Sequence, residues 1–235
     1  MPDKFYAYNN KLISPSAGNV LGVKEAPALA TRTMRFDFKY DHFNPIDGLA
    51  DLSGDGFIWT HVADDVYDFH YDNANWGYRQ LPIGRGGLFN IYGYPGSSGT
   101  VYPMTKHQFD VLDMDMTGVT DVSYLFNSAW SVQNIFSIRN TSAVTNFKFF
   151  IGHSGRIIAI PSIPLFDTSS ATNVDSMCQN TRNVESGALA LYQQMSSQAT
   201  PPSSHQSCFT GCGAGTTTGA AERAQIPKSW GGSMA

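Results

Sequence analysis

Four segments in the second half of the chain share one spacing of a hydroxyl residue and apolar residues. In each copy a Thr or Ser is followed by side chains of the repeat core at +2, +5 and +6, and successive copies begin 25, 27 and 31 residues apart. A single unit of this size cannot bury its own apolar residues, whereas stacked copies cover the apolar residues of their neighbours. The hydroxyl residues are Thr120, Thr145, Thr172 and Ser203. The predicted repeat core is Val122, Leu125, Phe126, Phe147, Phe150, Ile151, Val174, Met177, Cys178, Cys208 and Phe209.

The spacing predicts one helical turn and one short strand in each unit. Residues at +2, +5 and +6 lie on one face of a helix, and Thr or Ser is a favourable N-cap because its oxygen accepts from a backbone N–H of the first turn. We therefore expect Thr120, Thr145, Thr172 and Ser203 to be helix caps. A small residue follows at +9, at Ala129, Ser154, Thr181 and Cys212. An aliphatic residue follows at +12 in the first three copies, at Val132, Ile157 and Val184.

The third and fourth copies are separated by an insertion that has the pattern of a longer helix. Val184, Ala188, Leu191 and Met195 fall on one helical stripe, and two prolines at 201 and 202 end it. We expect this helix within 183–200. A second short helix is expected to begin near Thr218 and to be followed by a tail that reaches residue 235.

These repeats resemble those of BspA-type leucine-rich-repeat proteins, whose units read approximately F-D-T-S-x-V-T-[ND]-M-x-x-M-F-x-x-C-x-x-L. The resemblance covers residues 110–216 and implies a short, irregular leucine-rich-repeat solenoid of about four units. It departs from the pattern at 152–156 and at the insertion. The matching residues in one copy are Phe166, Asp167, Thr168, Ser169, Thr172, Asn173 and Met177. In another copy they are Asn140, Thr141, Ser142, Val144, Thr145 and Asn146.

The first half of the chain has a different pattern. Residues 1–32 show little periodicity and are expected to form an extended arm. Residues 34–40 alternate apolar and polar side chains, as a half-buried strand does, and 56–62, 65–72 and 86–94 are further strand candidates. We therefore expect a β-rich cap domain over 33–109, the repeats over 110–216 and a C-terminal helix with a tail over 217–235. The fold class is α+β.

Composition excludes several classes of protein. The 235 residues carry a formal net charge of −4 and only 14% charged residues, with no Lys/Arg run, so nucleic acid is not an expected partner. No stretch approaches the roughly 18 apolar residues of a membrane span, and the first residues lack the pattern of a secretory signal. We expect no membrane association and no secretory leader.

Two patterns suggest metal binding, and each has a simpler structural explanation. Asp51, Ser53, Asp55 and Gly56 match the start of a calcium loop, but position 12 is Val62 and not Glu, which favours a polar turn. His205 with Cys178, Cys208 and Cys212 could supply four zinc ligands, but the cysteines fall on repeat positions that are apolar or small in other copies. No catalytic motif is present. We expect no catalytic residue, no metal and no cofactor.

An aromatic-rich stretch is the candidate binding face. Aromatic side chains provide a large contact area at low entropic cost, which suits a sugar or a protein, although alternating aromatics in a small β domain also form cores. The candidate binding residues are Trp59, Tyr67, Tyr71, Trp76 and Tyr78.

Two further segments bear on function. Residues 183–194 and 216–230 resemble segments of proteins from phages and prophages of gut Bacteroides-type bacteria. The resemblance implies a non-enzymatic structural or adhesion protein of the virion, such as a head fibre, a capsid decoration or a tail-associated receptor-binding component. Its expected partners are further copies of itself, other virion proteins and a bacterial receptor or glycan. The alternatives are a BspA-like adhesin on a bacterial cell surface, binding host protein, and a carbohydrate-binding module.

Overall fold

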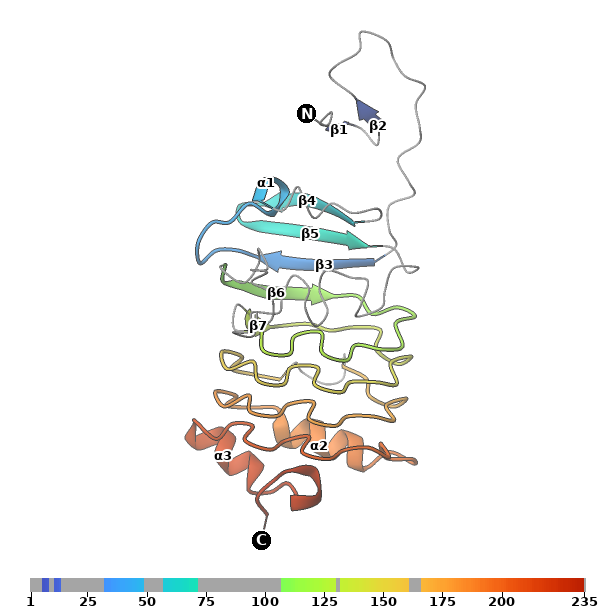
Figure 1. Ribbon diagram of the computed structural model, residues 1–235, viewed down its shortest axis with the longest axis vertical. Coiled ribbons are helices and arrows are strands. Elements are labelled where there is room, and N and C mark those ends of the chain that lie inside the picture. The colour runs from blue at the N-terminus through green and yellow to red at the C-terminus, as the bar shows by residue number, and fades with distance from the viewer. Residues whose placement is uncertain are drawn as a thin grey trace, which may run out of the picture.

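The computed structural model describes residues 6–8, 11–13, 32–48, 57–71, 107–129, 132–160 and 166–234. The fold is mixed α+β (Figure 1). A five-stranded sheet lies toward the N-terminal end, irregular coils stack below it, and two helices close the other end. The aromatic-rich residues 73–106, including the strand expected over 86–94, lie outside the described residues.

The sheet has the strand order β4-β5-β3-β6-β7. Its members are β3 (Arg32–Asp37), β4 (Phe57–Ala63), β5 (Val66–Tyr71), β6 (Phe109–Met114) and β7 (Val132–Ile135). Strands β6 and β7 are parallel, and the other pairs are antiparallel. The strands expected at 34–40, 56–62 and 65–72 are therefore β3, β4 and β5. The short helix α1 (Pro45–Gly48) lies between β3 and β4 in the chain.

Within residues 1–32, the region expected to be an extended arm, the structure describes only three elements. Strands β1 (Tyr6–Tyr8) and β2 (Lys11–Ile13) pair with each other in antiparallel fashion, outside the five-stranded sheet. Residue 32 already belongs to β3. A hairpin therefore occupies part of the segment.

Alternation along β3 separates a buried face of the sheet from a polar one. Met34 and Phe36 are fully buried, while Arg35 between them is exposed. Because successive side chains of a strand point to opposite faces, this register places the aromatic residues inside. The Phe36 ring meets those of Trp59 and Phe109 at centroid distances of 5.5 and 5.6 Å.

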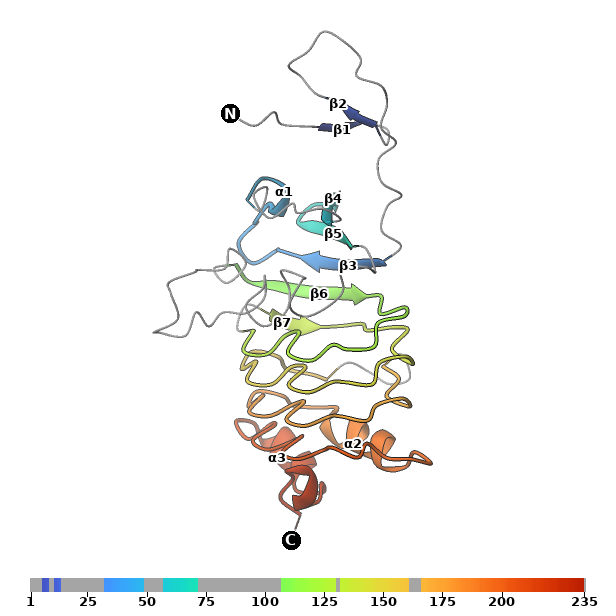
Figure 2. The same ribbon diagram turned by 45° about the vertical axis from the view of Figure 1, so that its right-hand side comes forward.

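Below the sheet the chain forms coils that stack in register (Figure 2). Each coil donates backbone hydrogen bonds to the next one along the chain: Phe126 to Phe150, Ile151 to Met177, and Cys178 to Cys208, at 2.8 to 3.0 Å. The residue after each hydroxyl position forms a parallel bridge to its counterpart in the neighbouring coil. These bridged residues are Asp121, Asn146, Asn173 and Ser204.

The expected helical turn is wrong, because each of these segments is a pair of tight turns. In the first copy the amide of Leu125 donates to the carbonyl of Val122, and that of Ala129 donates to the carbonyl of Phe126. The third residue of each turn has a positive φ, as in a type II turn. These residues stand at +4 and +8 in every copy: Tyr124, Ser128, Phe149, His153, Ser176, Asn180, Ser207 and Gly211. Two such turns bring +2, +5 and +6 to the same side, as one helical turn would.

The hydroxyl residues are therefore not helix caps. The Thr145 hydroxyl donates to the carbonyl of Thr120 at 3.1 Å, and the Thr172 hydroxyl donates to that of Thr145 at 3.2 Å. In the fourth copy the Ser203 hydroxyl donates to the carbonyl of Thr172 at 3.2 Å. The four residues form a column that links one coil to the next.

The interior of the stack continues the core of the sheet. All eleven residues of the predicted repeat core are buried, with exposures of 4% or less, and so are the residues at +9 and at +12. The eleven repeat-core residues belong to one hydrophobic cluster with Met34, Phe36 and Phe109. The expected boundary between the cap domain and the repeats lies between residues 109 and 110. Because β6 begins at Phe109 and β7 lies within the repeats, one sheet and one core extend across this boundary.

The C-terminal segment covers the last coil. Helix α2 (Ala188–Ser196) lies within the expected insertion and buries Ala188, Leu191 and Met195. Helix α3 (Thr217–Arg223) begins at a Thr216 cap, and the 3-10 helix η4 (Lys228–Trp230) follows. Their contacts close this end of the core. The Glu222 carboxylate accepts from the amides of Gly187 and Leu189, and the amide of Phe209 donates to the carbonyl of Trp230.

None of the described helices has both the length and the apolar character needed to cross a bilayer.

Candidate functional site

The aromatic residues expected to bind a ligand divide between the core and the undescribed part of the chain. Tyr67 is buried, and Trp59 packs on Phe69 with ring centroids 4.8 Å apart. Tyr71 ends β5, while Trp76 and Tyr78 lie outside the described residues. The two described side chains, Trp59 and Tyr67, thus belong to the core of the sheet or pack against it, as alternating aromatics in a small β domain can.

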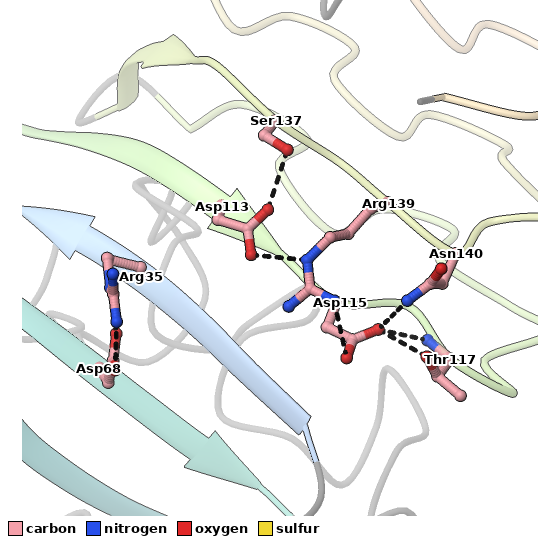
Figure 3. Close-up of polar contacts among 8 residues, drawn as sticks. All are labelled: Arg35, Asp68, Asp113, Asp115, Thr117, Ser137, Arg139 and Asn140. Atoms are coloured by element: carbon pink, nitrogen blue, oxygen red, sulfur yellow. Dashed lines mark hydrogen bonds and ion pairs between the residues drawn. The ribbon is translucent and has the colours of Figure 1, made fainter. Parts of the chain in front are cut away.

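Charged side chains form a row across the polar face of the sheet (Figure 3). Arg35 on β3 stands opposite Asp68 on β5 and Asp113 on β6 in the strand register. Its guanidinium donates two hydrogen bonds to Asp68, at 2.7 and 2.9 Å. The Asp113 carboxylate accepts from Arg139 and from the Ser137 hydroxyl, each at 2.8 Å. Signs therefore alternate from strand to strand, which favours this pairing of strands.

The row ends at Asp115, where the sheet meets the first coil. Arg139 lies 3.2 Å from one carboxylate oxygen, and the other accepts from Thr117 and from the Asn140 side chain. Burial alone would raise the pKa of Asp115, but hydrogen bonds from Thr117 and Asn140 and the Arg139 charge outweigh it. The pKa of Asp115 therefore lies below its usual value. These contacts are those of a structural junction.

We expect Asp115→Asn to destabilise the protein at neutral pH and not in acid. Because the folded pKa is depressed, ionised Asp115 stabilises the fold above about pH 4, and the contribution is lost as the pH falls through the folded pKa. The loss at pH 7 should be about 1 kcal/mol. Urea unfolding of both proteins from pH 3 to 7 measures it. Glu185→Gln, at an exposed carboxylate, is the control; a gap between wild type and Asp115→Asn that stays constant over this range would contradict the assignment.

A second carboxylate, Asp110, is fully buried on β6. Lys39 reaches it at 2.7 Å, the Tyr40 hydroxyl at 3.2 Å and the Asn134 amide at 2.8 Å. The hydrogen bond to Asp110 raises the pKa of Lys39. Burial, followed by the Asp110 charge, raises the pKa of Tyr40. The arrangement holds the turn after β3 against β6 and β7, since a buried carboxylate is stable only with such partners.

The cysteines considered as zinc ligands are small core residues. Cys178, Cys208 and Cys212 are buried, and burial raises the pKa of each thiol, that of Cys212 to about 11. A raised pKa disfavours the thiolate that binds metals. His205 instead stacks on Trp230 with centroids 4.2 Å apart and contacts the Pro202 carbonyl.

Within the described ranges, no group of three or more His, Cys, Asp or Glu residues is placed to hold a metal ion. The residues of the candidate calcium loop, Asp51, Ser53, Asp55 and Gly56, lie outside those ranges.

A column of aromatic rings runs along the outside of the first two coils. Tyr124 and Phe149 stack with ring centroids 5.2 Å apart and planes 20° apart, and His153 stacks on Phe149 at 6.0 Å and 23°. All three side chains are partly exposed. We call them the outer aromatic column. These residues stand at +4 and +8 of their copies, whereas the predicted core residues stand at +2, +5 and +6. The one sequence feature that indicates the column is an aromatic residue at +4 in two successive copies.

Comparison with known proteins identifies no relative: no protein-family model, no curated protein and no solved structure matches the chain.

Proposed function

We propose that the protein is a non-enzymatic structural and adhesion component of a bacteriophage particle. In this proposal the coils are BspA-like leucine-rich repeats that form a short solenoid and present an interaction surface, and the N-terminal segment serves as the anchor. The carrying observation is the register of the stack. Four copies hydrogen-bond in order, so that side chains at one offset form a column on the outside. Stacked repeats of this kind provide extended recognition surfaces.

The residues that carry the family resemblance have structural roles, which supports the repeat interpretation. Thr168 is fully buried, and the Asp167 carboxylate accepts from the amide of Ser169 at 2.7 Å. Asn173 accepts from the amide of Asp175 through its side chain and bridges two neighbouring coils through its backbone. Side chains that recur from copy to copy thus serve the turns and the ladder, as expected for a scaffold whose function lies in its outer positions.

The charged groups around the sheet also serve the scaffold. Asp68, Asp110, Asp113 and Asp115 each hold an Arg or Lys partner at 2.7 to 3.2 Å. The ion pairs that Asp113 and Asp115 form with Arg139 join the sheet to the first coil. This use suits a rigid particle component, and the assignment to a phage rests on the resemblance of residues 183–194 and 216–230.

Fractionation of cultures that produce the protein tests the proposal. Particles released by lysis are purified on a density gradient, and each fraction is analysed by quantitative mass spectrometry. We expect the chain to sediment with the major capsid and tail proteins in a fixed ratio. Recovery with the bacterial envelope and absence from particles would contradict a virion role and favour a cell-surface adhesin. A chain that lacks residues 1–32 tests the anchor, and we expect it not to be incorporated into particles. Undiminished incorporation would show that the N-terminal segment is not the anchor.

A further inference from the structure

The outer aromatic column occupies backbone positions that are unfavourable for large side chains. Tyr124, Phe149 and His153 have φ values of 63°, 53° and 61°. Bulky residues rarely adopt this left-handed conformation, and where they do, the strain often accompanies function. The turn itself does not require aromatic residues. The equivalent positions of the third and fourth copies hold Ser176, Asn180, Ser207 and Gly211.

The coil beneath the column is shaped to accept these rings. Gly152 lies under Phe149, and a Cβ at Gly152 would come within 2.8 Å of the Phe149 ring atom Cδ1. A residue with a side chain would displace the ring. The glycine therefore permits the arrangement in which the Phe149 ring stacks with both Tyr124 and His153.

Neutral hydrogen-bonding groups surround the rings. The Asn180 amide lies 3.5 Å from the His153 ring nitrogen Nδ1, and Ser128 and Gln179 are partly exposed at +8 and +7 of their coils. The column of residues at +3 adds one cation and one anion, Lys148 and Asp175, whose charges offset each other. The columns at +3, +4, +7 and +8 therefore combine aromatic surface with amide, hydroxyl and imidazole groups, and their one Lys and one Asp balance.

We propose that the outer aromatic column binds a neutral oligosaccharide. The C–H groups of a pyranose contact the parts of the three rings that their mutual stacking leaves exposed, and its hydroxyls pair with neutral amides and hydroxyls, so the two kinds of group found here match the two kinds of sugar surface. A protein partner fits less well, because a standard protein interface buries about 800 Å² on each side, whereas the column consists of three side chains on two coils. The inference rests on the proposed adhesive function and names its ligand class.

A glycan array tests this inference with the full-length chain. The probe is a printed set of neutral and acidic oligosaccharides, and each glycan bound is then titrated in solution by calorimetry. We expect wild-type protein to bind neutral members of the set. Phe149→Ser and His153→Asn introduce the residue type that the third copy carries at the same position, and each should weaken binding at least tenfold without unfolding the chain.

Phe136→Ser is the matched control, because Phe136 is 57% exposed and lies outside the column. This variant should bind as wild type does. A silent array, or unchanged affinity in both column variants, would overturn the inference. Particle co-sedimentation is scored separately: column variants that enter particles normally but lose glycan binding support the inference, whereas glycan binding by a chain absent from particles contradicts only the virion role.

Discussion

Replacing Phe126 by Asp is expected to unfold the stacked coils. Phe126 is fully buried, its amide donates to the Phe150 carbonyl, and the two rings pack with centroids 5.9 Å apart. The change removes a large core side chain, which alone costs about 3–5 kcal/mol. It also places a carboxylate among the buried apolar side chains of the core, and the sum approaches the whole stability of an ordinary domain. Circular dichroism and thermal melting should show loss of the cooperative transition.

Phe136→Asp separates this effect from the introduction of a charge as such. Phe136 lies just beyond β7 and is 57% exposed, so its carboxylate would stay in water. We expect a change of less than about 1 kcal/mol. If Phe126→Asp melted as wild type does, the register that places Phe126 in the core would be wrong.

Gly219→Ala is the second change with a large expected effect. We expect it to lower the free energy of unfolding, although helix propensity alone would raise it. Within α3, alanine should be about 1 kcal/mol better than glycine. However, a Cβ at Gly219 would collide with the Val184 carbonyl oxygen and lie 2.6 Å from the Gly213 Cα. Because those neighbours are backbone atoms, α3 must move away from the last coil. We expect a loss of about 3 kcal/mol in urea unfolding.

The neighbouring Thr218→Ala variant is the control for propensity. Thr218 is exposed on the same helix, so alanine there should leave stability unchanged or raise it slightly. A gain in stability for both variants would show that α3 is not packed against Val184.

Burial in the repeats could be predicted from the sequence, but the local conformation could not. The +2, +5, +6 spacing identifies buried side chains whether the chain forms a helical turn or two tight turns, since both bring these residues to one side. Tyr124 and Phe149 have positive φ values, which propensity assigns to Gly and Asn. Hydrogen bonds from the neighbouring coil, such as that of the Tyr124 amide with the Lys148 carbonyl, supply what local preference lacks.

Neither the row of charged side chains across the sheet nor the outer aromatic column could be predicted from the sequence, for two different reasons. Arg35 and Asp113 are 78 residues apart in the chain and become neighbours only through the pairing of β3 with β6. The column is visible in the sequence only as an aromatic residue at +4 in two copies. The helix expected within 183–200 was easier to predict, because its apolar stripe extends over several turns and lies on a single face.

Disulfide trapping within the hydroxyl column tests the central claim, the in-register stacking of the coils. Adjacent strands of a parallel ladder lie about 4.8 Å apart, within the Cα range that a disulfide spans, and two layers lie roughly 10 Å apart, beyond it. Thr120, Thr145 and Thr172 are exposed, whereas the native cysteines are buried, so only the introduced pairs should react. Mild oxidation should cross-link Thr145→Cys with Thr172→Cys but not Thr120→Cys with Thr172→Cys. Equal cross-linking of both pairs, or of neither, would contradict the stack.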